Sequence, residues 1–351
     1  GTQPRGAQVR CEHRGQTLNE RRSRLLLALF IAACAMMLPL SLMIGSVRLN
    51  PIDAFNALLA PDDRSLAAAI VALRLPRAVT AIAVGGLLAL SGGLLQALLR
   101  NPLADPYVLG ISGGAACAAM VAIAAGAGAW VTHGAAVLGA LAALAALFLL
   151  ARRALFGAEH VSGESASSSI LLVGVMMASF AAAVLSLALS LAPAGRLRSM
   201  IFWLLGDLSG TQDPLTAWIS LAVLVLCGGA CLRDARALNL MLRGDLQAFT
   251  QGVRVEQVRR RLVIVASIAT GWAVALAGAI GFVGFVAPHL ARFAVGNDQR
   301  LALPATLFVG AALLAGADLA ARTVAAPAQL PVGVLTVMIG VPVFLWQLRR
   351  Q

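Results

Sequence analysis

The sequence predicts an all-α, polytopic membrane protein with about ten transmembrane helices, and its composition and hydropathy pattern support this fold class. Of its 351 residues, 60% are hydrophobic and 12% are charged, and its mean hydropathy is +0.87. Apolar runs of roughly 20 residues, the length that crosses a bilayer, recur from Leu25 nearly to the C-terminus. A soluble core has no place for so many apolar residues, so the bilayer is the expected solvent.

The first 24 residues are polar and arginine-rich, and we interpret them as a cytoplasmic N-terminal tail. Residues 25–351 then form the transmembrane domain. Arg21 and Arg22 before an apolar run have the form of a twin-arginine export signal. The run continues to about Val47, which is too long for the apolar region of a signal peptide. It is therefore interpreted as the first membrane anchor.

Polar breaks divide the apolar sequence into ten predicted spans. They are expected at residues 25–46, 77–99, 107–127, 132–151, 168–192, 214–232, 262–279, 281–295, 302–321 and 330–348.

The net charge of +12 comes from arginine alone, because all 27 basic residues are arginines. With the N-terminus in the cytoplasm, the ten spans place most arginines on the cytoplasmic side, as the positive-inside rule requires. Both termini are then cytoplasmic, and a nucleic-acid partner is not expected. A phosphate-binding loop of the P-loop type needs a lysine, so the chain is not expected to be an ATPase or any other enzyme. Seven arginines remain outside: Arg48, Arg64, Arg74, Arg77, Arg196, Arg198 and Arg322.

Small residues crowd the predicted spans, with glycine pairs at 85–86, 92–93 and 113–114. Such residues let helix backbones approach closely in lipid. Residues 83–92 also resemble residues 269–278 at an offset of 186 positions, and the topology runs the two segments in opposite directions. This pattern indicates an inverted repeat, with chance matching of Gly/Ala-rich helices as the alternative.

The longest predicted cytoplasmic connection, 233–261, carries an amphipathic stripe of Leu240, Leu242, Leu246 and Phe249. Gly244 and Gly252 break the stripe, which favours two short helices with a bend. The simplest use of such a segment is to dock a soluble partner, and a helix lying on the membrane surface is the alternative.

Metal and haem ligation are not expected of this chain. The five cysteines are scattered, four of them in or beside apolar runs, and Cys227 and Cys231 stand at a helix-packing spacing. His13 and His160 lie in polar segments, and His133 lies at a span end. No metal site or cofactor is therefore predicted.

Several segments, in order along nearly the whole chain from residue 25, resemble the FecCD-type permeases, the type II ABC importers of vitamin B12, haem and ferric siderophores. The matching segments include Arg74-Leu75-Pro76-Arg77, Ser91 to Gln96, Asn101 to Pro106, Leu109 to Gly114, Gly278 to Gly284 with Pro288-His289, Ala317-Asp318 with Arg322, and Leu330 to Gly333. The resemblance implies a homodimer of ten-helix subunits in the bacterial inner membrane, in contact with lipid. It also implies two ATPase subunits, which hold ATP and Mg²⁺, on the cytoplasmic face and a periplasmic binding protein outside.

The resemblance also implies three sets of functional residues. Arg74, Arg77 and Arg322 match arginines that meet acidic residues of the binding protein, against the alternative of interfacial arginines reaching lipid headgroups. The other two sets are a cytoplasmic gate formed by Asn101, Leu103, Ser167 and Ser168, and a segment coupled to the ATPase, with Met241, Gly244, Asp245, Ala248 and Gly252.

Haem is the favoured cargo, because Arg196 to Gly206 looks similar to the haem-type members. Ferric siderophore and cobalamin are the alternatives by the same mechanism. An ion-coupled secondary transporter would share the inverted repeat but should carry an ionisable group inside the membrane. The acidic residues here lie in predicted loops or near span ends, with Asp318 near the outer end of its span.

Overall fold

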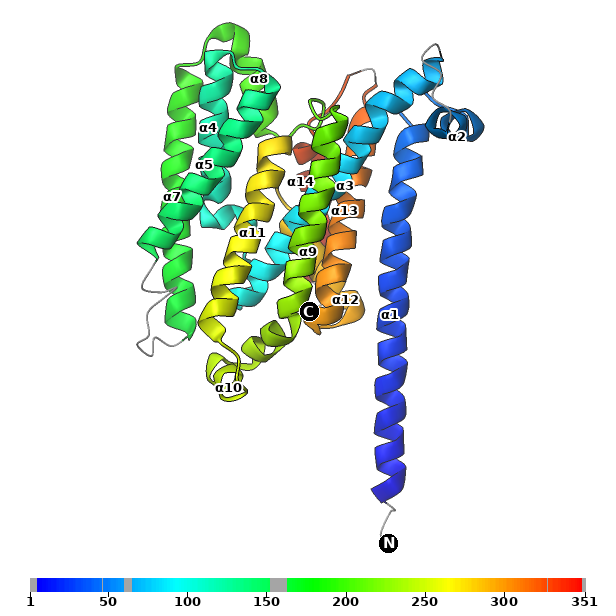
Figure 1. Ribbon diagram of the computed structural model, residues 1–351, viewed down its shortest axis with the longest axis vertical. Coiled ribbons are helices and arrows are strands. Elements are labelled where there is room, and N and C mark those ends of the chain that lie inside the picture. Colours follow the sequence, from blue (N-terminus) through cyan, green and yellow to red (C-terminus); the bar gives the residue numbers. More distant parts are fainter. Residues whose placement is uncertain (1–4, 46, 60–64, 152–162, 327, 349–351) are drawn as a thin grey trace.

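The computed structural model describes residues 5–45, 47–59, 65–151, 163–326 and 328–348, and these form helices joined by short connections (Figure 1). The elements are α1 (Arg5–Met43), α2 (Pro51–Leu59), α3 (Leu66–Leu98), η1 (Pro106–Leu109), α4 (Ile111–Ala125), α5 (Ala129–Leu150), α7 (Gly163–Ser190), α8 (Ala194–Leu204), α9 (Pro214–Arg243), α10 (Asp245–Thr250), α11 (Val255–Ala277), α12 (Val283–Val295), α13 (Gln299–Thr323) and α14 (Val332–Leu348).

The predicted all-α membrane fold is confirmed, and each of the ten predicted spans falls on a helix. Within the described residues, seven helices are long and apolar enough to cross a membrane: α1, α3, α5, α7, α9, α11 and α13. Shorter apolar stretches on α4, α12 and α14 supply the other three. The first helix starts earlier than the predicted span 25–46, because α1 begins at Arg5 and runs through the polar segment without a break.

The bundle has two ends, which we name after the short helices found there (Figure 1). The α2 end carries α2, α8 and the connection from α13 to α14. The α10 end carries α10, the turn after α3 and the connection from α12 to α13. Helices α3 and α13 start at opposite ends and pack along each other, which brings residues far apart in sequence together at both ends.

Helix α3 forms the centre of the bundle and is buried along nearly its whole length from Pro76 to Leu98. Helices α9, α11, α12 and α13 all pack against it. Glycine makes this packing possible. A Cβ added at Gly92 would lie 1.8 Å from the carbonyl oxygen of Gly284, and one at Gly85 would lie 2.4 Å from that of Gly310. The close approach predicted from the glycine pairs is therefore present at these two crossings.

The two similar segments lie on α3 and α11, which run in opposite directions side by side, as an inverted repeat requires. Their contact includes a buried hydrogen bond of 2.7 Å between the hydroxyls of Ser91 and Thr270. The same Ser91 hydroxyl donates to the carbonyl oxygen of Ala266 at 2.9 Å. These polar groups therefore satisfy one another inside an apolar bundle.

The connection at 233–261 differs from the two short helices predicted. Helix α9 continues unbroken to Arg243, because Leu238 and Met241 keep it packed on the core, and a separate short helix, α10, follows only after Gly244. At Gly244 the backbone has φ 139° and ψ 142°, a conformation that favours glycine. The predicted bend is thus confirmed, but the part of the segment before it belongs to the spanning helix α9.

Candidate functional site

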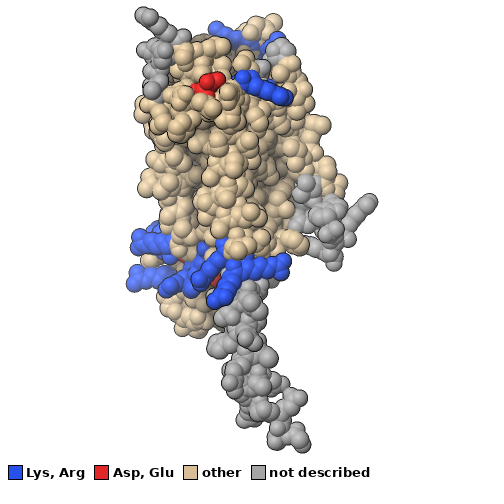
Figure 2. All heavy atoms as spheres, turned by 90° about the vertical axis from the view of Figure 1, so that its right-hand side faces the viewer, with Lys and Arg blue, Asp and Glu red and all other residues tan. Residues whose placement is uncertain are grey.

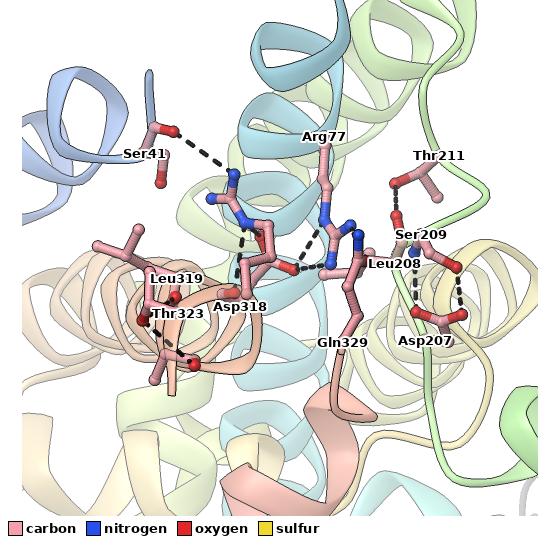
Figure 3. Close-up of polar contacts among 12 residues, drawn as sticks. Ser41, Arg77, Asp207, Leu208, Ser209, Thr211, Asp318, Leu319, Thr323 and Gln329 are labelled. Carbon is pink, nitrogen blue, oxygen red and sulfur yellow. Dashed lines mark hydrogen bonds and ion pairs between the residues drawn. The ribbon is translucent and has the colours of Figure 1, made fainter. Parts of the chain in front are cut away.

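Two predicted docking arginines, Arg77 and Arg322, converge on Asp318 at the α2 end (Figure 3). Arg77 donates from Nε and Nη2 to Oδ1 of Asp318 at 3.0 and 2.8 Å. The Nε of Arg322 lies 3.0 Å from Oδ2 of the same carboxylate. A third bond joins Nη1 of Arg77 to the side-chain oxygen of Gln329 at 2.8 Å. We call Arg77, Asp318 and Arg322 the buried cluster, because they are 4%, 1% and 6% exposed.

Arginines at this end also bind the last turn of α1 and the segment that follows it. Arg74 donates to the carbonyl oxygens of Leu42 and Val47 at 2.7 and 2.6 Å, and Nη1 of Arg322 reaches the carbonyl oxygen of Ser41 at 3.5 Å. The last four carbonyls of a helix have no partner within it, and the C-terminal end of the helix dipole attracts cations. The arginines therefore tie α1 to α3 and α13.

The predicted docking set is thus present at one end of the bundle, but its members are not equally available. The guanidinium groups of Arg77 and Arg322 are enclosed within the subunit and bound to Asp318. Arg74 is half-buried and bound to α1 carbonyls. Contact of Arg77 or Arg322 with a partner's carboxylate requires the buried cluster to open, and the docking role stays a prediction.

At the other end, the turn after α3 contains the predicted gate residues Asn101 and Leu103. Arg100 directly follows the C-cap of α3 and has a φ of 49°, which is unusual for a residue with a side chain. The Asn101 side chain accepts a hydrogen bond of 2.9 Å from the Leu103 backbone N–H, which is an Asx turn. Leu103 is 60% exposed. Its apolar side chain is therefore free to close against another surface.

The other two predicted gate residues, Ser167 and Ser168, lie in the first turns of α7. Their side chains lie outside the part of the chain whose side chains are described. The structure therefore describes the side chains of two of the four residues predicted to form a gate, and the gate stays a prediction.

Arg100 joins this turn to the predicted coupling segment. Its Nη2 donates to the carbonyl oxygen of Met241 and to Oδ1 of Asp245, both at 2.7 Å. The second oxygen of Asp245 binds Nη2 of Arg259, on α11, at 2.6 Å. We call Arg100, Asp245 and Arg259 the open cluster, because the carboxylate and both cations are partly exposed. It links the end of α3 to α9, α10 and α11.

Helix α10 presents an apolar surface at the tip of the molecule. Leu246 and Phe249, one helical turn apart, are 76% and 70% exposed. On the opposite face, Ala248 is fully buried against the bundle with Met241. Exposed large apolar side chains beside polar groups are typical of a protein interface. The predicted amphipathic stripe is therefore not one surface, because Leu240 and Leu242 are half-buried against the core while Leu246 and Phe249 are exposed.

Asp105 ends the turn after α3, residues 100–105, which we call the gate turn after the predicted role of Asn101 and Leu103. Its Oδ1 accepts a hydrogen bond of 2.8 Å from the backbone N–H of Tyr107 and caps η1. Burial raises the pKa of the Asp105 carboxyl to about 6, although the hydrogen bond from Tyr107 opposes the shift. Asp105 therefore titrates close to neutral pH.

Sequence reasoning missed Arg100 and Arg259 as functional candidates. In the sequence both belong only to the excess of arginines on the predicted cytoplasmic side, and residue 100 stands far from residues 245 and 259. The one available signal was the position of Arg100 directly before the Asn101-Pro102 turn. The contact between Asp318 and Arg77, separated by 241 positions, was equally hidden.

Known proteins are similar to this chain over almost its whole length. The FecCD transport family matches residues 29–350. The vitamin B12 import system permease protein BtuC of Vibrio vulnificus is 40% identical over 336 residues, covering 94% of this chain and 96% of the relative. The hemin transport system permease protein HmuU of Yersinia pestis is 39% identical over 289 residues, covering 80% of this chain and 82% of the relative.

A solved structure shares the arrangement of the helices. It is described as an inward-facing conformation of a metal-chelate type ABC transporter, and it superposes with a TM-score of 0.79 at 27% identity. The match covers 94% of this chain and all of the solved one. The chain belongs to the FecCD transport family and is an ABC transporter permease.

Proposed function

We propose that this chain forms, as a homodimer, the transmembrane pathway of an ABC importer. Two separate ATPase subunits dock at the α10 end, and a periplasmic substrate-binding protein docks at the α2 end. ATP and Mg²⁺ belong to the ATPase subunits, because the chain has no lysine for a P-loop, and no cofactor is assigned to the chain itself. The permease family of the chain supports this division of labour.

The distribution of charge supports this orientation. Figure 2 shows arginine side chains gathered in a band at the α10 end, with a broad zone free of charge above it and fewer arginines at the α2 end. The positive-inside rule makes the arginine-rich end cytoplasmic. Helix α1 begins at that end (Figure 1), so the N-terminus is cytoplasmic in this proposal. The location is then the bacterial inner membrane.

The observation that carries the proposal is the link from the tip of α10 to the gate turn. The exposed Leu246 and Phe249 offer a surface for the ATPase. Asp245 begins the same short helix and binds Arg100, the residue directly before Asn101. A displacement of α10 by a closing ATPase is therefore passed to the turn that carries Leu103 through the Arg100–Asp245 ion pair. The hydrogen bond from Arg100 to the Met241 carbonyl ties the same turn to the end of α9.

Haem is the proposed cargo, and cobalamin is supported equally by the relatives, which include permeases for both. An apolar hollow of about 930 Å³ between α4, α5 and α7, lined by residues such as Gly114, Ala143, Met176 and Phe180, favours haem. The flat apolar face of a porphyrin loses no hydrogen bonds against such a lining, whereas polar amide groups would.

Reconstitution tests the function and the cargo together. The permease, its ATPase and its binding protein are incorporated in liposomes, and uptake of haem and cobalamin is followed with ATP and with a non-hydrolysable analogue. We expect ATP-dependent haem accumulation that needs all three proteins. Uphill transport by the permease alone, driven by an ion gradient, would show a secondary transporter and refute the proposal. ATP-driven uptake of cobalamin but not haem would refute the cargo assignment alone.

A further inference from the structure

An apolar groove lies on the surface between α1 and α9, with α3 and α13 as its floor. It has a volume of about 310 Å³, and the side chains that line it are apolar, from Cys34 on α1 to Leu221 and Leu232 on α9 and Leu303 and Leu307 on α13. Gly229 lines it as well, and a Cβ added there would meet nothing within 4 Å. The groove is therefore open to a long, thin apolar group.

A cationic pocket of about 700 Å³ lies on α9 and α13 at the α10 end. Arg236 and Arg243 of α9 and Arg300 of α13 line it. Asp298 also lines it, and its Oδ1 is bound by the side-chain amide of Asn239 at 2.7 Å and by the backbone N–H of Arg300 at 3.0 Å. Three guanidinium groups therefore face one carboxylate that is already hydrogen-bonded.

The groove and the pocket are consecutive stretches of one surface. Leu232, in the groove, and Arg236, in the pocket, are four residues apart on α9 and share a helix face. Leu303, in the groove, and Arg300, in the pocket, are three residues apart on α13. Both helices thus change from apolar to cationic at the same level, which Figure 2 shows as the border between the uncharged zone and the arginine band.

The dimensions of this surface match half a bilayer. From Leu221 to Leu232 the helix rises roughly 16 Å, and one leaflet of the hydrocarbon core is roughly 15 Å thick. Arg236, Arg243 and Arg300 are exposed, and their guanidinium groups have no partner among the described residues. Unpaired cations at the end of an apolar groove complement an anionic headgroup joined to an acyl chain.

We propose that this surface binds an anionic phospholipid of the arginine-rich leaflet, with an acyl chain in the groove and the phosphate among Arg236, Arg243 and Arg300. The bound lipid fills the space between α1 and α9, and it holds α1 against the rest of the bundle. The site depends on neither the cargo nor the ATPase.

The full-length chain is purified, stripped of lipid, and titrated with phosphatidylglycerol or phosphatidylcholine while native mass spectrometry counts bound lipids. We expect phosphatidylglycerol to bind more tightly. Removing two arginines in Arg236→Gln/Arg300→Gln should weaken phosphatidylglycerol about 25-fold, at about fivefold per arginine. Phosphatidylcholine should weaken much less, because its choline already offsets the charge of its phosphate. Gly229→Leu fills the groove and should weaken both lipids.

Two matched variants serve as controls. Arg233→Gln removes an exposed arginine of α9 that lies outside the pocket, and Gly134→Leu adds the same side chain to α5 at an open position. Both should bind lipid like the unaltered chain. Equal losses in the controls, or full displacement of the lipid by millimolar inorganic phosphate, would overturn the proposal. Unchanged lipid binding in Arg236→Gln/Arg300→Gln together with lost affinity for the ATPase would identify the arginines as a protein contact instead.

Discussion

The two ends of the molecule carry the same chemical group in different surroundings. In the buried cluster, Asp318 lies between Arg77 and Arg322 at 2.8 and 3.0 Å, and its side chain is 1% exposed. In the open cluster, Asp245 lies between Arg100 and Arg259 at 2.7 and 2.6 Å, and its side chain is 24% exposed. Each carboxylate thus bridges two guanidinium groups, and the difference is access to water.

This difference assigns the two clusters different tasks. Charges removed from water depend on each other completely, so the buried cluster fixes α1, α3 and α13 in one arrangement. Partly hydrated charges exchange their partners for water at little cost, so the open cluster can lengthen, shift or re-form as α10 moves. A transporter needs both kinds of contact, because one part of the bundle must stay rigid while another part moves relative to it.

The largest expected effect follows from neutralising the buried carboxylate. Asp318→Asn leaves Arg77 and Arg322 charged and without a counter-ion in the interior, which costs about 3 to 5 kcal/mol. We expect a large loss of folded protein and a much lower thermal midpoint, measured in detergent by size-exclusion chromatography of heated samples. Asp245→Asn, the same change in the open cluster, should cost about 1 kcal/mol or less. Equal losses would remove the contrast between the two ends.

Replacing the whole buried cluster separates its internal role from docking. A buried ion triad exchanged for apolar residues of similar size is often as stable as before. The variant Arg77→Met/Asp318→Leu/Arg322→Met should therefore fold. If Arg77 and Arg322 also receive the binding protein, as the family resemblance implies, this folded variant should lose stimulation of ATP hydrolysis by that protein. Retained stimulation would show that the cluster has only the internal role.

A smaller effect on stability, and a larger one on coupling, is expected at the open cluster. Arg100→Gln breaks the bond to Asp245 that connects α10 with the gate turn and the bond to Met241 that connects α9 with it. We expect the amount transported per ATP hydrolysed to fall about tenfold, since coupling free energies between sites are typically 1 to 3 kcal/mol. The thermal midpoint should change by no more than about 3 °C. Uptake and phosphate release are measured in the same liposomes.

Two comparisons show whether this bond carries the coupling. Arg254→Gln removes an exposed arginine near α10 for which the described residues provide no partner, and it should transport normally. Combining Arg100→Gln with Asp245→Asn should add little to either single change, because residues that act through one bond are not additive. A further tenfold loss in the double variant would mean that the two residues act separately.

Most of the helices could be predicted from sequence, because seven of the apolar runs alone satisfy the length and hydropathy that a bilayer demands. The glycine pair at 92–93 even predicted a close helix crossing, which the carbonyl of Gly284 completes. The extension of α9 beyond residue 232 could not be predicted, because arginines there indicate the membrane surface but not the end of a helix. What keeps it helical is contact of Leu238 and Met241 with the core, which is tertiary information.

The positions of the candidate site residues could be predicted only in part, and their roles stay predictions. Resemblance placed Asn101, Leu103 and Asp245 at one end of the bundle and Arg77 and Arg322 at the other, and the structure brings together the members of each set that it describes. The pairing within each end was not predicted. An ion pair between residues 77 and 318 leaves no periodic trace in the sequence, since it depends on where two helices cross.

Asp105 extends the comparison to a carboxylate with no arginine beside it among the described residues. Its folded pKa of about 6 exceeds the ordinary value of 3.8, so between these values the folded protein binds more protons than the unfolded one. Stability therefore falls as the pH rises from about 4 to about 6 and then stays level. The full shift corresponds to about 3 kcal/mol, and partial exposure to solvent reduces it to about 1 kcal/mol.

Asp105→Asn keeps an oxygen that can accept the Tyr107 hydrogen bond and removes the titration. We expect the variant to be more stable than the unaltered chain at pH 7.5 by about 2 °C in thermal midpoint and to lose most of this advantage by about pH 4. The difference between the two proteins isolates Asp105 from the other carboxylates, which titrate in both. A difference that does not vary with pH would mean that Asp105 is ionised at a normal pKa. Water would then reach the Asp105 carboxylate in the folded protein.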